Sequence, residues 1–194
     1  MLHSGRFNVV LDACVLYPAP LRDFLLRLAS EDLYHPVWSD LIQQEWKRNL
    51  LANRSDLKEI QLNKTISLMN KAFPDAEVNG FYAIIDSLTL PDDDDRHVLA
   101  AAIRSGSELI VTFNLKDFPA AELSKYDIEA QHPDVFIEHL IDLDSGKAIS
   151  AFQALVGSLK NPPETEKEVL KTLDANGLKK SVDLLDKLLS GKGN

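Results

Sequence analysis

The sequence predicts an α/β fold with a mainly parallel central sheet, followed by a small helical appendage. Through residues 1–144, short apolar stretches of strand length alternate with longer stretches of helical periodicity, a pattern typical of βα units. From about residue 145 the strand-like stretches stop and only helical periodicity remains. We therefore expect an α/β domain over residues 1–144 and a C-terminal helical extension over residues 145–194.

The predicted strands are short and apolar. The first covers residues 7–11, of which four are apolar, and Asp12 follows it directly. A second strand is expected at Leu33–His35 and should stop at Pro36, which has no backbone N–H to donate. The remaining strands are expected within Glu108–Phe113 and near Ile128.

The predicted helices of the α/β domain carry apolar residues three or four positions apart. The first begins after the turn that Pro18 and Pro20 mark, and the next begins at the N-cap pair of residues 39 and 40. A buried helix with an acidic start contains Val98–Ile103 and is stopped by Gly106. Further helices are expected at residues 55–73, 80–88 and 133–143.

The C-terminal extension should contain three helices. Asn161-Pro162-Pro163 separates the first from the second, and Asn176-Gly177 separates the second from the third. We interpret its lysines as a solvated helix face, and no pattern of acids or histidines indicates chemistry there.

Charge and cysteine content narrow the class of protein. The 194 residues have a formal net charge of −9. Residues 1–144 hold 24 acidic and 13 basic residues, whereas residues 145–194 hold 6 acidic and 8 basic ones. An acidic body argues against a generic nucleic-acid coat protein. The single cysteine, Cys14, excludes an intramolecular disulfide and a cysteine-based zinc site. With no membrane-length apolar run and no signal peptide, we expect a cytoplasmic protein.

Acidic side chains recur where the predicted fold would bring them to one edge of the sheet. Asp12 follows the first strand, the run Asp92–Asp95 opens a helix, and Asp117 follows the third strand. In a parallel α/β sheet the active site lies outside the carboxyl ends of the strands. Gathered carboxylates raise one another's pKa unless a cation neutralises them. Mg²⁺ or Mn²⁺ is the expected cation, because hard divalent ions favour oxygen ligands.

Each acid taken alone also has a structural explanation. Asp12 and Asp117 could be turn residues, Glu45 could be a solvated helix residue, and the run Asp92–Asp95 could cap a helix. The functional hypothesis therefore depends on the whole set. Among the other residue types, we interpret His97, Trp38 and Trp46 as packing residues and Cys14 as a small buried hydrophobe.

Four blocks of sequence together resemble the PIN-domain nucleases, and most closely the VapC-like toxins of bacterial toxin–antitoxin pairs. The likeness covers residues 7–143 and is carried by residues 9–16, 39–50, 90–102 and 111–119. It implies a three-layer α/β/α sandwich. The three C-terminal helices are similar to an extension that follows the PIN domain in one branch of these toxins.

The resemblance also implies roles for individual residues. Asp12, Glu45 and Asp95 match the three acids that would hold Mg²⁺, or alternatively Mn²⁺. Asp117 is the expected fourth ligand, or alternatively only supports the loop. Many PIN domains have a further acid where this chain has Asn114, so the fourth position departs from the family pattern. Supporting roles are implied for Asp92, Thr112 and Asn114. Thr112 could hydrogen-bond Asp12 or a water, and Arg96 could contact a phosphate or pair with its aspartate neighbours.

The function that the resemblance implies is a metal-dependent endoribonuclease that hydrolyses RNA through a metal-activated water. Its expected partners are an RNA substrate, a cognate antitoxin protein and a second copy in a homodimer. One alternative is a PIN-like interaction module without catalysis. Another is a phosphatase or receiver domain that uses Asp12. The phosphatase would usually have a second aspartate where Cys14 stands, and the receiver's acidic pair and late lysine are not found in frame.

Overall fold

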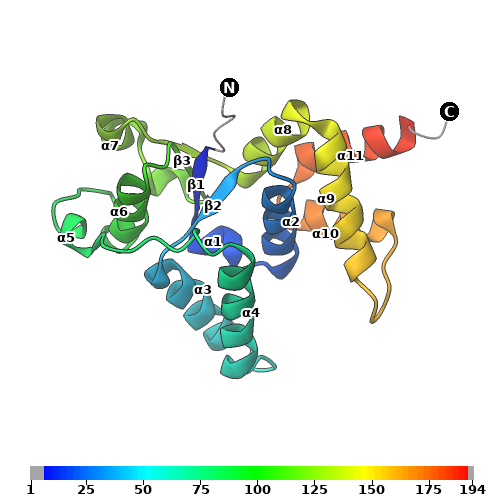
Figure 1. The fold of residues 1–194 in the computed structure, drawn as a ribbon, viewed down its shortest axis with the longest axis horizontal. Coiled ribbons are helices and arrows are strands. Elements are labelled where there is room, and N and C mark those ends of the chain that lie inside the picture. The colour runs from blue at the N-terminus through cyan, green and yellow to red at the C-terminus, as the bar shows by residue number, and fades with distance from the viewer. Residues whose placement is uncertain (1–6, 192–194) are drawn as a thin grey trace. The chain divides into compact units, whose positions relative to one another are not determined.

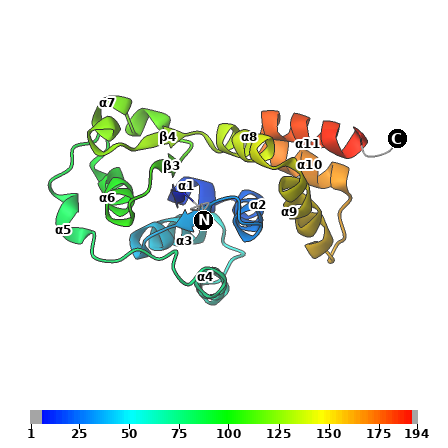
Figure 2. The ribbon, with the colours of Figure 1, turned by 45° about the horizontal axis from the view of Figure 1, so that its top comes forward.

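A computed structural model describes residues 7–191 and contains a four-stranded sheet in which every pairing is parallel (Figures 1 and 2). The strand order is β2-β1-β3-β4. The strands are β1 (Asn8–Leu11), β2 (His35–Val37), β3 (Leu109–Val111) and β4 (Glu129–Gln131). The predicted α/β class with a mainly parallel sheet is therefore confirmed.

Helices and short 3₁₀ turns fill the chain between and after the strands. The α-helices are α1 (Ala13–Leu16), α2 (Ala19–Ser30), α3 (Asp40–Asn53), α4 (Glu59–Ala72), α5 (Tyr82–Ile85), α6 (Arg96–Ser105), α7 (Ala120–Leu123), α8 (Pro133–Leu143), α9 (Ser145–Ser158), α10 (Glu166–Ala175) and α11 (Lys179–Gly191). The 3₁₀ turns are η1 (Asp93–Asp95), η2 (Leu115–Asp117) and η3 (Ser124–Tyr126). The three predicted C-terminal helices are thus present as α9, α10 and α11.

The described residues group into two compact units, each built from two separate stretches of the chain. The sheet unit comprises residues 7–17 and 35–131, and the helical unit comprises residues 18–34 and 132–191. The helical unit therefore contains α2 and α8 in addition to the three C-terminal helices. The domain boundary expected after residue 144 stays a prediction.

In the sheet unit, the pairing of β1 with β3 sets the position of the residues that follow both strands. The three residues of β3 lie opposite Val9, Val10 and Leu11 of β1. These three residues of β1 are fully buried. The N–H of Asp12 continues this ladder by donating to the carbonyl of Val111 at 3.1 Å. Asp12 therefore lies between β1 and α1, beside the end of β3, at the carboxyl edge of the sheet.

The second strand lies two residues later than the sequence predicts. The structure has β2 at His35–Val37, with Pro36 inside the strand and opposite Val9. The prediction that Pro36 ends the strand is wrong because β2 is an edge strand, where a missing N–H can face away from the ladder.

Two helices of the sheet unit show how local chemistry sets their ends. Ser39 caps α3 as predicted, since its hydroxyl accepts from the N–H of Ile42 at 3.2 Å. The helix expected from residue 55 begins instead at Glu59. It starts late because residues 54–57 form a turn, in which the N–H of Leu57 donates to the carbonyl of Arg54 at 3.1 Å.

Helix α6, which follows the aspartate run of residues 92–95, packs directly on the sheet. In α6, residues 98–102 are buried, and the helix contacts β1 and β3. Gly106 ends it with a φ of 63°, the left-handed conformation that glycine adopts without strain. The start of α6, which carries the aspartate run, is thereby fixed against the central strands.

The helical unit is held by aromatic packing and by one buried carboxylate. Phe24 of α2 and Phe152 of α9 pack edge to face, with ring centroids 6.3 Å apart. Asp134 of α8 accepts hydrogen bonds from the N–H of Lys180 at 3.0 Å and of Ser181 at 2.9 Å. Asp134 thus caps the start of α11 from a neighbouring helix.

In the part of the chain that the structure describes, no helix is both long enough and apolar enough to cross a membrane.

We expect Asp134→Ala to lower the free energy of unfolding by about 2 kcal/mol, because it leaves buried N–H groups at the start of α11 without an acceptor. Urea unfolding of the full chain measures the loss. Asp142→Ala is the matched control, since Asp142 lies on the same helix and is exposed. An equal loss in the two variants would show that Asp134 has no special capping role.

Candidate active site

The carboxylate of Asp12 is buried and held in a fixed orientation. Asp12 is 2% exposed. Its Oδ1 accepts from the N–H of Ala13 at 2.6 Å, and its Oδ2 accepts from the hydroxyl of Thr112 at 2.7 Å. The Thr112 hydroxyl in turn accepts from the N–H of Asn114 at 2.9 Å, so its proton is directed to Asp12. Of the two partners that the sequence allowed for Thr112, the structure has Asp12.

Cys14 belongs to the same network, which the sequence interpretation missed. Its thiol donates to Oδ2 of Asp12 at 3.1 Å, and its Sγ accepts from the N–H of Phe113 at 3.3 Å. Cys14 is therefore a half-buried polar partner of Asp12 and not simply a small buried hydrophobe. Burial, followed by the charge of Asp12, raises the pKa of the thiol, which keeps it protonated as a donor.

The carboxyl group of Asp95 is affected by the charges of the other predicted acids. It ends η1 and directly precedes α6. Burial raises its pKa to about 7, together with the charges of four acids, which are, in decreasing order of effect, Asp12, Asp92, Asp117 and Glu45. Such an electrostatic effect requires proximity. The structure therefore brings the predicted acids into one neighbourhood.

The pKa of Asp12 is also raised. Burial is the largest cause, and the charge of Glu45 adds to it. The hydrogen bonds from Thr112, Cys14 and Ala13 act in the opposite direction, because they stabilise the ionised carboxylate. Asp12 is thus a carboxylate whose burial is only partly compensated by the protein itself.

Glu45 has a partner that the sequence did not indicate. It lies on α3, and its side chain is 27% exposed. Its Oε2 is 3.1 Å from Nε2 of His97, which is in the first turn of α6. The sequence predicts a packing residue at His97, and its signal for another role is its place two residues after Asp95. Trp38 and Trp46 are fully buried, as expected for packing residues.

The remaining candidates occupy less enclosed positions. Asp117 ends η2 and is half-buried, whereas Asn114, just before η2, is exposed. Asp92 is exposed and caps η1, since its Oδ1 accepts from the N–H of Asp94 at 2.9 Å. These positions leave the functional roles of all three as predictions.

Arg96 pairs with a neighbouring aspartate, which is one of the two alternatives that the sequence left open. Its Nε donates to the carbonyl of Asp93 at 3.0 Å and lies 3.4 Å from Oδ1 of Asp93. The guanidinium is thus engaged by η1. Its predicted contact with a phosphate remains untested.

The chemistry of these side chains fits a hard divalent cation. The donors are carboxylate oxygens, and their mutual repulsion is the charge that such a cation would offset. Among residues 7–191, no three His, Cys, Asp or Glu side chains converge tightly enough to hold a metal ion as they stand. The donor type and the charge therefore fit Mg²⁺ or Mn²⁺, while a closed coordination shell is not formed.

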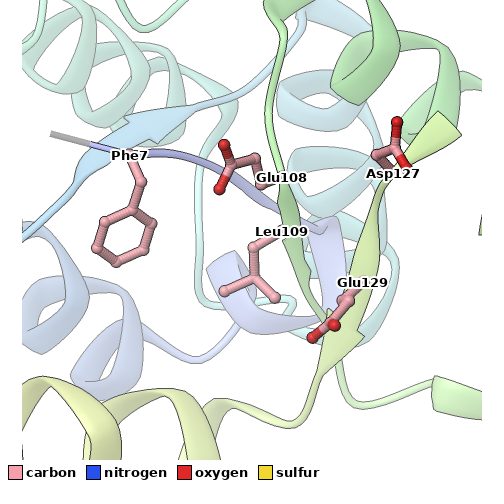
Figure 3. Close-up of a pocket in the computed structure, with 5 residues that line it drawn as sticks. All are labelled: Phe7, Glu108, Leu109, Asp127 and Glu129. Carbon is pink, nitrogen blue, oxygen red and sulfur yellow. The ribbon is translucent and has the colours of Figure 1, made fainter. Parts of the chain in front are cut away.

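A pocket of about 390 Å³ lies at the amino ends of the strands, opposite the end at which Asp12 lies (Figure 3). Its lining comes from the starts of β3 and β4 and from residues just before strands: Phe7, Glu108, Leu109, Asp127 and Glu129. None of the predicted site residues lines it. Because ligands of parallel α/β sheets bind beyond the carboxyl ends of the strands, we place the candidate site at the Asp12 edge.

The chain matches two family models, the PIN domain over residues 8–116 and the VapC50 C-terminal domain over residues 133–187. A stretch of 79 residues is 43% identical to a protein of Mycobacterium tuberculosis (strain ATCC 25618 / H37Rv) named "Putative ribonuclease VapC50". The aligned stretch covers 41% of this chain and 47% of that relative, so the chain spans about half the length of the curated relative it matches. No solved structure matches the chain.

Without divalent cations, we expect the contribution of Asp95 to the free energy of unfolding to fall as the pH rises from about 4 to about 7. Over this range the unfolded chain has lost the Asp95 proton, since the ordinary pKa is 3.8, whereas the folded chain retains it up to about pH 7. The folded state therefore binds more protons, and raising the pH favours unfolding. Urea unfolding in EDTA at several pH values measures the slope.

Two variants separate the contribution of Asp95 from those of other groups. Asp95→Asn should show a shallower decline than the wild type, because an amide does not titrate. Asp94→Asn, at an exposed neighbour in the same run, should follow the wild type. Parallel curves for the wild type and Asp95→Asn would contradict the raised pKa of Asp95.

Proposed function

The chain belongs to the PIN-domain family, and from this premise we propose that it is a metal-dependent endoribonuclease that acts as the toxin of a toxin–antitoxin pair. The observation that carries the proposal is the buried Asp12 carboxylate at the carboxyl end of β1, where Thr112 donates to it at 2.7 Å. The charges of Asp12, Asp92, Asp117 and Glu45, which raise the pKa of Asp95, support it. The name of the relative, a putative ribonuclease, and the match to the VapC50 C-terminal domain support the same function.

In this proposal, Asp12, Glu45, Asp95 and Asp117 hold the cation. Bound Mg²⁺ or Mn²⁺ supplies Lewis acidity, which lowers the pKa of a water and offsets charge on a phosphodiester. Asp12 is prepared for this role because the hydrogen bonds that it accepts from Thr112, Cys14 and Ala13 fix the carboxylate plane. Oδ1, whose one described donor is the N–H of Ala13, retains a lone pair for the cation. Asp95, whose charge is disfavoured by burial and by the neighbouring acids, would be stabilised as a carboxylate by such a cation.

The local charges suggest how RNA reaches an acidic protein. Residues 1–144 carry an excess of acids, so general attraction of RNA is weak. Two exposed cations lie close in sequence to the proposed ligands: Arg48, three residues after Glu45 on α3, and Lys116, beside Asp117. We infer that contacts of this kind hold the phosphates, since Arg96 is engaged by Asp93.

The proposed partners follow from the same charge. The excess of acids over bases in residues 1–144 would favour an antitoxin that presents a basic segment.

We also propose that the protein forms a homodimer, which sedimentation of the purified chain tests directly.

Metal-dependent cleavage of RNA by the purified chain tests the catalytic proposal. The wild type should cleave single-stranded RNA with Mg²⁺ or Mn²⁺ and lose this activity in EDTA. Asp12→Asn and Asp95→Asn should each reduce the rate by at least about 100-fold, because each removes a negative charge that would hold the cation, and the cation offsets the charge of the transition state. Asp94→Asn serves as the control, since this exposed aspartate is not among the proposed ligands.

The outcome also decides between the proposal and its alternative, a PIN-like interaction module without catalysis. The absence of a closed coordination shell among residues 7–191 is the observation that favours the module. Equal RNA cleavage by the wild type, Asp12→Asn and Asp95→Asn, or none by any of them, would support the module and reject the nuclease.

Binding of the cognate antitoxin should weaken as salt increases, because counter-ions screen attraction between the acidic sheet unit and a basic segment. Calorimetric titration at several NaCl concentrations between about 50 and 500 mM, a range over which the Debye length shortens several-fold, measures the effect. An affinity that does not change with salt would reject the basic segment as the main determinant of binding.

A further inference from the structure

We propose that His97 is a positioning residue that orients the Glu45 carboxylate toward the divalent cation. The inference rests on the proposed function, because it assigns His97 a role toward the cation of that site. Its basis is a single contact between two helices, the 3.1 Å approach of His97 Nε2 to Glu45 Oε2. That contact joins α3, which carries Glu45, to α6, which begins directly after Asp95.

The imidazole is more buried than the carboxylate it contacts. The His97 side chain is 13% exposed and that of Glu45 is 27% exposed. Glu45 stands in the middle of α3 with three rotatable side-chain bonds, so without a partner its carboxylate would sample several positions. A hydrogen bond from a packed imidazole removes much of this freedom before any cation binds.

The surroundings of the second ring nitrogen of His97, Nδ1, indicate which of the two nitrogens carries the proton. Nδ1 of His97 is buried and has no hydrogen-bond partner among the described residues. A proton on Nδ1 would be a buried donor without an acceptor, whereas a proton on Nε2 is donated to Glu45. The geometry therefore favours the arrangement in which Nε2 carries the proton and donates it to Oε2 of Glu45.

The placement of the pair also explains why one hydrogen bond would affect the whole site. Glu45 acts electrostatically on both Asp12 and Asp95. His97 is two residues from Asp95 along the same segment, so a shift of the imidazole moves Glu45 relative to the other acids. Residues that hold a ligand in place in this way typically contribute about ten-fold or more to metal affinity.

The affinity of the full-length chain for Mn²⁺, measured by calorimetry, tests the inference without relying on activity. His97→Phe removes the donor but keeps a planar ring, and it should weaken Mn²⁺ binding about ten-fold. His97→Gln keeps an N–H near the position of Nε2 and should bind close to the wild-type affinity. His139→Phe is the matched control, because His139 is an exposed histidine on α8 of the helical unit.

A double-mutant comparison separates positioning from general packing. In a Glu45→Gln background the carboxylate is absent, so adding His97→Phe should not weaken Mn²⁺ binding further. Thermal unfolding of each variant confirms that it is folded, and His97→Met replaces His97→Phe if the latter is not. Unchanged Mn²⁺ affinity in the apolar variant, or an equal loss with and without Glu45, would overturn the positioning role.

The same titrations distinguish this failure from failure of the proposed function. If the wild type binds Mn²⁺, Asp12→Asn does not and His97→Phe matches the wild type, only the positioning role is rejected. If the wild type itself does not bind Mn²⁺, the metal-dependent function and the positioning role are both rejected.

Discussion

Asp12 and Thr112 are 100 residues apart in the sequence, yet they share a 2.7 Å hydrogen bond because β1 and β3 pair in parallel. The register places Leu11 opposite Val111, so the residues that follow the two strands emerge side by side. The loop after β3 then depends on the same hydroxyl, since Thr112 accepts from the N–H of Asn114. A one-residue slip between these strands would separate the pair and turn each side chain to the other face.

The arrangement places unfavourable charge where the fold is most constrained. Burial raises the pKa of Asp12, and burial with nearby carboxylates raises that of Asp95. Without a counter-charge such groups oppose folding, so their gathering at one sheet edge calls for a physical explanation other than stability. A divalent cation provides one. The negative charge that first argued against nucleic acid is thus compatible with RNA as a substrate.

The sequence was informative where structure depends on neighbours in the chain. The Ser39 cap, the helix at residues 133–143 and the stop at Gly106 all follow from local rules, and all are present. The predicted PIN-like fold class is confirmed by the parallel sheet and the family match. By contrast, the position of β2 depends on its place at the sheet edge. The contact of His97 with Glu45 depends on two helices that are distant in sequence, and no local pattern reports such a meeting.

The division of the helical unit into two stretches has a consequence for how the chain acquires its structure during synthesis. Phe24 of α2 is made early, but its ring partner, Phe152 of α9, follows more than a hundred residues later. At typical elongation rates this interval lasts on the order of ten seconds. During that time α2 lacks the aromatic partner that covers part of its apolar face, and it is exposed to misassociation or to chaperones. The helical unit can close only after α9 has been made, which makes a late helix a folding requirement for α2.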